Sequence, residues 1–153
     1  ITVGEEGQLV KYYIYIQQQR FKDKLSVTVD IDDAIYGYQI QKLTLQPLVE
    51  NAVIHGLEQK MEHCVLDIRG RQEDDDLVFI IRDNGVGMLE EKLSEVVRAL
   101  EDAEEQTGSI GYGLSNVNRR IKLHFGEGCG IHVISTAGLG TTVTVRIKAW
   151  PYE

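Results

Sequence analysis

The sequence predicts an α+β domain, a two-layer α/β sandwich in which helices cover one face of a mixed sheet of about five strands. Segments with apolar residues at alternate positions indicate strands, and they are interspersed with segments of helical periodicity in the order αβαββ(α)αββ. No internal repeat and no Pro- or Ser-rich linker divides the chain. Its 153 residues, 42% of them apolar, are sufficient for one domain with a single core.

A helix over residues 5–21 is expected to open the domain. Leu9, Tyr13 and Ile16 recur at helical spacing and form an aromatic stripe, and Thr2 is placed to cap the helix. We expect the stripe to pack against the domain or against a helix that precedes this chain.

The next two elements are a strand and a second helix. Residues 25–31 alternate apolar and polar side chains, which predicts a half-buried strand. From Leu45 to about Gln59, apolar residues recur at i, i+3, i+4, i+7 and i+8, which predicts a helix. Pro47 suits its first turn, where the missing N–H leaves no hydrogen bond unmade.

Two strands over residues 64–70 and 77–82 are expected to form a hairpin, because both are rich in apolar residues and a short acidic run joins them. That run is Glu73-Asp-Asp-Asp76. Adjacent carboxylates in a turn are usually solvated, and we expect these to be solvated rather than to bind a cation.

The second half of the chain is expected to contain two helices and two strands. Residues 89–107 are highly charged with a thin apolar stripe, which predicts a partly helical, weakly anchored segment. A helix with one apolar face should run from Leu114 to Phe125, where a Gly-rich break ends it. Strands are expected at residues 131–135 and 141–147.

Composition excludes several classes of function. The net charge of −8 argues against a nucleic-acid surface, which needs clustered cations. Cys64 and Cys129 have no zinc-ligand or disulfide pattern, which favours a reduced, cytoplasmic setting. No apolar run of about 18 residues indicates a membrane span. The chain opens at Ile1 without a Met, which suggests a fragment of a longer protein.

Asn51 and His55 lie four residues apart on the second helix, so their side chains should leave the same face. An amide oxygen is a hard, neutral ligand that suits Mg²⁺, which usually keeps phosphate oxygens and waters as its other ligands. The neighbouring Glu50 is placed to orient a metal-bound water or to accept a proton. Taken alone, however, Asn51 is more often a packed or capping polar residue.

Two glycine-rich segments could complete a nucleotide site. Asp83-Asn-Gly-Val-Gly87 would alone be an ordinary turn, but Gly87 allows close backbone approach to a flat ligand and Asp83 can accept a hydrogen bond from an exocyclic amine. Residues 108–114 precede a helix whose free N–H groups favour phosphate, although the segment lacks the third glycine of the dinucleotide fingerprint. Gly140-Thr141 could add a hydroxyl group.

Together these segments are far more specific than any one of them. Glu50-Asn-Ala-Val-Ile-His-Gly56, Asp83-Asn-Gly-Val-Gly-Met88, Gly111-Tyr-Gly-Leu114 and Gly140-Thr141 resemble, in order and spacing, the N, G1 and G2 boxes and the late Gly-Thr of the GHKL ATPases. Leu-Gln-Pro-Leu-Val-Glu-Asn-Ala and Gly-Leu-Ser-Asn-Val-Asn-Arg-Arg-Ile are similar to motifs of the LytS/YesM-like bacterial sensor histidine kinases. The resemblance implies a Bergerat-type ATP-binding fold.

The resemblance also implies roles for individual residues. Asn51 would ligate the Mg²⁺ that bridges the ATP phosphates, with Glu50 as its catalytic neighbour, and Asp83 would bind the adenine amine with help from a water and Thr141. Glycines of both loops would contact the base and wrap the phosphates, the latter within a mobile lid over roughly residues 89–113. The implied ATP-binding set is Asn51, His55, Asp83, Gly85, Gly87, Met88, Gly111, Gly113, Leu114 and Thr141.

The resemblance further divides the chain and implies partners. Residues 1–22 would link it to an upstream phosphoacceptor and dimerisation domain, and residues 23–153 would form the ATP-binding catalytic domain that phosphorylates a histidine there. The full-length protein would be a membrane-anchored homodimer that serves a cognate response regulator, with this fragment as a cytoplasmic domain that contacts neither membrane nor nucleic acid. None of its four histidines lies in an acceptor motif, so the fragment should bind ATP without phosphorylating itself.

Departures from the family pattern keep other functions open. Pro47 stands where ATP-hydrolysing relatives carry a catalytic Glu, and Ile54 where several histidine kinases have a phosphate-contacting Lys; Arg119 or Arg120 could replace that charge. A catalytically silent nucleotide-sensing or interaction module, and a scaffold that binds no nucleotide, are therefore alternatives. An anti-sigma-type protein serine kinase is a third, which the leading helix disfavours.

Overall fold

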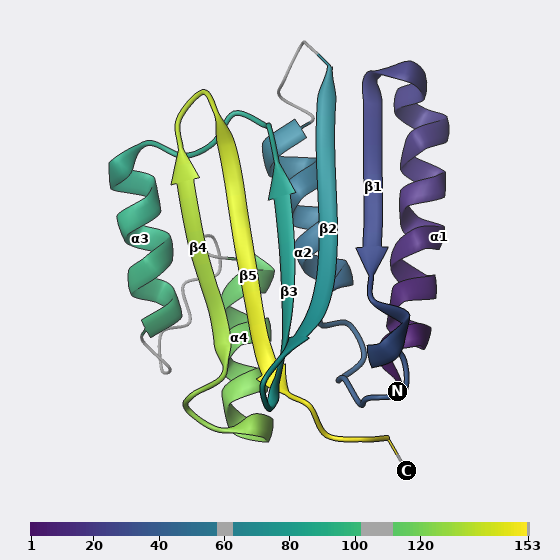
Figure 1. Ribbon diagram of the computed structural model, residues 1–153. Helices are drawn as coiled ribbons and strands as arrows, with labels where there is room; N and C mark the ends of the chain where they lie inside the picture. The colour runs from purple at the N-terminus through teal and green to yellow at the C-terminus, as the bar shows by residue number, and fades with distance from the viewer. Residues whose placement is uncertain (58–62, 102–111, 153) are drawn as a thin grey trace.

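A five-stranded mixed sheet forms one layer of the domain (Figure 1). The computed structural model describes residues 1–57, 63–101 and 112–152. Strand β1 pairs with β2 in parallel, and the other neighbouring strands are antiparallel, in the order β1-β2-β3-β5-β4. The strands are β1 (Leu25–Ile31), β2 (Cys64–Glu73), β3 (Asp76–Asp83), β4 (Gly130–Thr136) and β5 (Gly140–Lys148).

Helices form the second layer. Figure 1 shows α2 and α4 behind the sheet, with α1 and α3 toward its two edges. The element order and the mixed sheet predicted from periodicity are confirmed, whereas the predicted helix end near Gln59 lies outside the described residues. The helices are α1 (Val3–Phe21), α2 (Gln46–Asn51) with its π-helical continuation η3 (Ala52–Leu57), α3 (Glu90–Glu101) and α4 (Tyr112–Phe125), with short 3₁₀ turns η1 (Lys22–Lys24) and η2 (Asp33–Ile35).

The core lies between the two layers, because alternate residues of the central strands face the helices. Each fully buried Leu, Ile or Phe side chain stabilises the fold by about 1.5–3 kcal/mol relative to the same side chain exposed to water. Among the described residues, no helix combines the length and the hydropathy that crossing a bilayer requires. The largest fully buried apolar side chains are Ile35, Leu45, Leu48, Leu66, Ile68, Leu77, Phe79, Ile81, Ile121 and Ile147.

The aromatic stripe predicted on α1 packs on the core only in part. Thr2 caps the helix as expected, in a reciprocal capping box with Glu5. Of the stripe, Tyr13 packs against the core, whereas Leu9 is 37% and Ile16 49% exposed. The fully buried face of the helix contains Val10, and packing of the stripe on a preceding helix stays a prediction. Apolar residues occur on both sides of this helix, so periodicity alone could not select the buried face.

Glu6, which is fully buried on α1, fixes the start of α2. Its carboxylate accepts the backbone N–H groups of Leu43, Thr44, Leu45 and Gln46 at 3.1, 2.9, 2.8 and 3.3 Å. The side chain of Leu45, the N-cap residue of α2, accepts no hydrogen bond from the first turn. The Glu6 carboxylate on α1 takes the role of the missing cap. A carboxylate also suits the positive end of the helix dipole.

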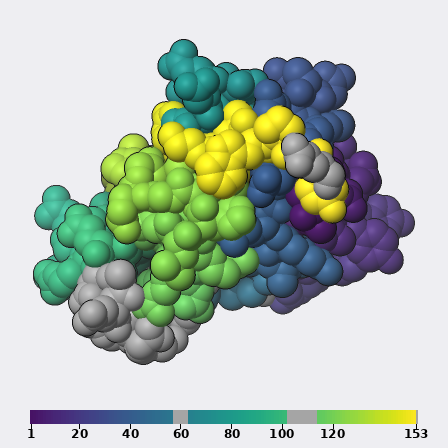
Figure 2. Space-filling model, turned by 90° about the horizontal axis from the view of Figure 1, so that it is seen from below, coloured from purple at the N-terminus to yellow at the C-terminus, as the bar shows by residue number. Residues whose placement is uncertain are grey.

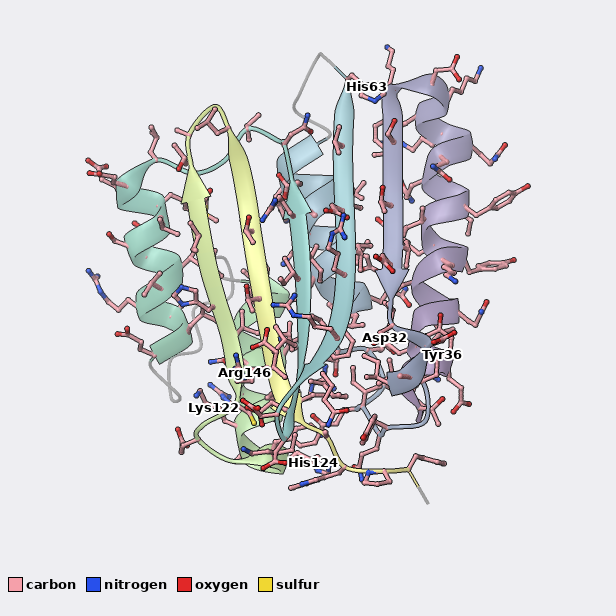
Figure 3. The ribbon with its side chains drawn as sticks, viewed as in Figure 1. Asp32, Tyr36, His63, Lys122, His124 and Arg146 are labelled. Atoms are coloured by element: carbon pink, nitrogen blue, oxygen red, sulfur yellow. The ribbon has the colours of Figure 1, made fainter. Side chains whose placement is uncertain are left out.

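The lower end of the sheet, as drawn in Figure 3, is held by ion pairs around the labelled Arg146. Arg146 contacts Asp76 at 3.0 Å and Glu73 at 3.3 Å, and Lys148 contacts Asp76 at 3.1 Å. The expectation that the acidic run is simply solvated is therefore wrong for these two carboxylates. The antiparallel register places β5 cations beside the β2–β3 turn, which the sequence alone did not reveal.

The C-terminal segment packs at the same end of the molecule, against α4 and the segment before α2. Seen from below, the yellow C-terminal segment runs past α4 toward the N-terminal region (Figure 2). The ring of Trp150 lies 5.0 Å from that of Phe125, centroid to centroid, and the Gln39 N–H donates to the Trp150 carbonyl oxygen at 2.8 Å. The loop before α2 is thus fixed on this side as well.

Candidate functional site

A cavity of about 380 Å³ lies between the sheet, α2 with η3, and α3. Sheet residues form its floor, and the two helical segments and the loop after β3 form its walls. Its volume falls within the usual range for small-molecule sites, roughly 300–1,000 Å³. It is lined by Leu48, Asn51, Ala52, His55, Gly56, Ile81, Asp83, Val86, Gly87, Met88, Leu89, Lys92, Val96, Leu114, Thr141 and Val143.

The wall formed by α2 and η3 contributes Asn51 and His55, so the two side chains face one cavity as their spacing predicts. Pro47 lies in the first turn of α2, as expected. Glu50 does not line the cavity; its carboxylate accepts a hydrogen bond from the Gln46 side-chain amide at 3.0 Å. The π-helical geometry of η3 follows directly after Asn51, and π-helical turns often occur at functional sites.

The floor of the cavity is formed where β3 and β5 pair. Asp83, the last residue of β3, is only 7% exposed and is the register partner of Thr141 on β5. The Asp83 Oδ1 accepts the Gly85 N–H at 2.8 Å, which fixes the carboxylate at the start of the loop. A Cβ at Gly56 would lie 3.0 Å from the same Oδ1, so a larger residue there would crowd the Asp83 carboxylate.

Asn84 joins the loop after β3 to the start of β2, where His63 is labelled in Figure 3. Its Oδ1 accepts the Val65 N–H at 2.7 Å, and its Nδ2 donates to the His63 carbonyl oxygen at 3.2 Å. The Asn84 backbone N–H also donates to the Val65 carbonyl oxygen at 3.2 Å, so backbone and side chain together tie this loop to β2. The position of Asp83 is fixed by this neighbour.

The two glycines of this loop make room for protein backbone. A Cβ at Gly85 would lie 2.2 Å from the Gly56 carbonyl oxygen, and one at Gly87 would lie 2.0 Å from that of Thr136. Gly87 also has a φ of +68°, which favours glycine. Of the two, Gly87 lines the cavity and Gly85 does not.

Helix α3 and Leu89, the residue before it, supply lining residues that sequence reasoning missed. Leu89, Lys92 and Val96 follow one another at i, i+3 and i+7 and line the same wall. The apolar pattern of this segment indicated a helix, and the same spacing would have placed Lys92 beside the apolar stripe. Among the residues that the structure describes, Lys92 is the only Lys or Arg that lines the cavity.

The structure describes only part of the predicted phosphate loop. Leu114, on α4, lines the cavity. Gly111 and residues 102–111 of the predicted lid lie outside the described residues. Arg120 does not line the cavity; its guanidinium donates to the carbonyl oxygens of Lys42 and Leu43, in the segment before α2.

No group of three or more His, Cys, Asp or Glu side chains capable of holding a metal ion occurs in the described ranges. Among the described residues that line the cavity, the side chains with oxygen atoms are the Asn51 amide, the Asp83 carboxylate and the Thr141 hydroxyl. Such a set fits a metal ion that arrives with oxygen ligands of its own, as Mg²⁺ does with phosphates.

Comparisons with known proteins agree on one family. Residues 40–151 match the family described as histidine kinase-, DNA gyrase B-, and HSP90-like ATPases. The chain is 37% identical over 147 residues to the sensor histidine kinase YesM of Bacillus subtilis, and 33% identical over 149 residues to the sensor protein LytS of Staphylococcus haemolyticus. These matches cover 96% and 97% of this chain but only 24% and 25% of the relatives.

Solved structures share the fold at low sequence identity. A nucleotide-free catalytic domain of the histidine kinase ThkA superposes with a TM-score of 0.69 at 16% identity, covering 99% of this chain and 97% of that one. The mycobacterial sensor histidine kinase MprB superposes with a TM-score of 0.66 at 17% identity, covering the same shares of the two chains.

Proposed function

The chain belongs to the histidine kinase-, DNA gyrase B-, and HSP90-like ATPase family, and we propose that its cavity binds Mg-ATP and presents the γ-phosphoryl group to a histidine elsewhere in the full-length protein. The family assignment and the α+β fold predicted from the motifs are confirmed. The domain is of the ATP-binding catalytic type found in sensor histidine kinases. The chain spans about a quarter of the length of these relatives, so the transfer reaction is a proposal.

One observation carries the proposal: residues from separate motifs converge on a single cavity. Asn51 and His55 come from α2 and η3, Asp83 from β3, Leu114 from α4 and Thr141 from β5. No single motif of this set identifies a nucleotide site. Their convergence beside apolar side chains from the sheet and α3 supports a slot for a flat base with polar groups at its floor.

We assign the base to the floor and the phosphates to the end near Asn51. The Asp83 carboxylate would accept an adenine amine proton, with Thr141 beside it, and Gly87 would line the cavity next to the base. The Asn51 amide oxygen would be the protein ligand of Mg²⁺, which when bound neutralises charge on the phosphate oxygens. Glu50 stays a catalytic candidate only through its place next to Asn51.

The remaining assignments concern the full-length protein. We propose that residues 1–22 connect the domain to an upstream phosphoacceptor and dimerisation domain, and that residues 23–153 are the catalytic unit. The protein would act as a homodimer with a cognate response regulator, and this domain would lie on the cytoplasmic side of a membrane-anchored kinase. Gly85, Met88, Gly111, Gly113 and Leu114 complete the proposed nucleotide-binding set.

A catalytically silent nucleotide-binding module is the second candidate. Ile54, at the position where related kinases carry a phosphate-contacting Lys, is 46% exposed and does not line the cavity. Arg120 is engaged with backbone carbonyl oxygens and does not replace that charge at the cavity. A module of this kind would bind ATP without transferring phosphate.

Titration calorimetry with Mg-ATP, Mg-GTP and ADP, followed by a transfer assay, tests these proposals. In the assay, γ-labelled ATP is added together with a separate helical domain that carries the acceptor histidine. Binding of ATP and labelling of that histidine support the kinase. Binding without transfer supports the silent module, and absence of binding at millimolar Mg-ATP would contradict both.

A further inference from the structure

Behind the floor of the cavity, Ser135 on β4 is the register partner of Thr141 on β5. The Ser135 Oγ lies 2.8 Å from the Thr141 Oγ1, 3.1 Å from the Gly140 carbonyl oxygen and 2.9 Å from the Met88 backbone nitrogen. Thr141 lines the cavity, whereas Ser135 does not. Ser135 therefore contacts both the loop after β3 and the hydroxyl group that faces the ligand.

The chemistry of the three contacts fixes the direction of each hydrogen bond. A serine hydroxyl has one proton and two lone pairs. The Gly140 carbonyl oxygen only accepts, so it receives the Ser135 proton, and the Met88 N–H only donates, so it occupies one lone pair. The second lone pair then accepts the Thr141 proton. If Ser135 instead donated its proton to Thr141, the Ser135 Oγ and the Gly140 carbonyl oxygen would lie 3.1 Å apart with no proton between them.

We infer that Ser135 is a positioning residue that turns the Thr141 proton away from the cavity, so that Thr141 faces the ligand as a hydrogen-bond acceptor. Asp83, the register partner of Thr141 on β3, also lines the cavity and presents carboxylate oxygens to it. The polar groups of the floor would then all accept hydrogen bonds. Such a floor matches a base with an amino group, directly or through a water, and disfavours a base with a keto oxygen at the same position.

This inference rests on the proposed function and adds a determinant of base selection to it. It is tested by the dissociation constants of Mg-ATP and Mg-ITP, because inosine carries a keto oxygen where adenine carries the amine. In Ser135→Ala the Thr141 hydroxyl is free to rotate and to donate into the cavity. We expect the preference for ATP over ITP to fall about three- to tenfold, the value of one neutral hydrogen bond.

Two further variants separate positioning from simple loosening of the fold. Ser135→Thr keeps the hydroxyl and should keep the preference. In a Thr141→Val background, Ser135→Ala should change the ratio no further, because Ser135 acts through Thr141. If Ser135→Ala does not fold, Ser135→Cys replaces it: the thiol is only a weak hydrogen-bond donor and acceptor, so the preference for ATP should fall as expected for Ser135→Ala.

The outcomes distinguish the inference from the function on which it depends. Equal losses of ATP and ITP affinity in Ser135→Ala, or additive effects in the double variant, would overturn the positioning role while leaving ATP binding intact. Failure of the wild-type chain to bind Mg-ATP would overturn the proposed function and the inference with it. Ser26→Ala, an exposed serine on β1, is the matched control and should leave the ratio unchanged.

Discussion

The Glu6 carboxylate on α1 accepts the Leu45 N–H at 2.8 Å and so caps the helix that carries Asn51. We expect Glu6→Gln to lower the free energy of unfolding by about 2–3 kcal/mol, because hydrogen bonds to a charged group are lost in a buried site. The midpoint of urea unfolding measures this change. Glu95→Gln, exposed on α3, should stay within about 0.5 kcal/mol of wild type, and equal effects of the two would contradict the capping role.

Gly56 gives a second prediction, which concerns the affinity of the site for ATP rather than the stability of the fold. A Cβ there would press on the Asp83 carboxylate at 3.0 Å, so we expect Gly56→Ala to weaken ATP binding about tenfold, as a displaced hydrogen-bond partner would. Calorimetric titration measures the affinity. Gly128→Ala is the control, because a Cβ at Gly128 would meet no atom within 4 Å. Unchanged affinity in Gly56→Ala would show that the Asp83 position is not critical.

Strands and motifs could be predicted from the sequence because their signals are local. The alternation within Leu25–Ile31 and the apolar runs on either side of the acidic turn identified strands within a few residues of their observed bounds. The order of the motifs identified the family, and through it the residues that meet at the cavity. Asn51 and His55 needed only helical spacing to be placed together.

The features that escaped prediction depend on contacts between distant parts of the chain. Glu6 caps a helix that begins about 40 positions later, and nothing near it in the sequence indicates burial. The buried face of α1 depends on which of two apolar faces the sheet accepts. Ser135 becomes significant only when β4 and β5 pair, and Lys92 only when α3 packs beside the cavity.

Asp83 provides the test of base recognition. We expect Asp83→Ala to weaken ATP binding by about 1.5–3 kcal/mol, the usual cost of losing a hydrogen bond to a charged group. Because the Ala variant also frees the Gly85 N–H, Asp83→Asn should be compared with it, since its amide oxygen can still accept that bond. Asp67→Asn, outside the cavity, is the control. Unchanged affinity in both Asp83 variants would exclude the adenine assignment.

The ion pairs around Asp76 predict how stability depends on pH. Burial raises the pKa of Asp76, but hydrogen bonds from Arg146 and Lys148 and their charges outweigh it, and the pKa lies below the ordinary value of 3.8. A carboxyl with a lowered folded-state pKa stabilises the fold above its ordinary pKa, and this contribution is lost as the pH falls through the folded value. In Asp76→Asn, the loss of stability on acidification below about pH 4 should be shallower.

Thermal unfolding from pH 7 to pH 2 measures this dependence. Asp23→Asn, an exposed carboxylate on η1, should reproduce the wild-type curve. If the stability of Asp76→Asn fell with acidification as steeply as that of the wild type, Asp76 would contribute no pH-dependent stability.

Asn51 is tested by the dependence of binding on Mg²⁺. If its amide oxygen holds the metal, Asn51→Ala should weaken ATP binding in the presence of Mg²⁺ far more than in EDTA, since without the metal the residue has no ligand to hold. Asn51→Asp keeps an oxygen donor and should retain part of the Mg²⁺ dependence. Titrations of each variant with ATP, with and without Mg²⁺, give the four affinities needed. Equal losses in both conditions would mean that Asn51 serves packing or contacts the nucleotide directly, and the metal would then need another protein ligand.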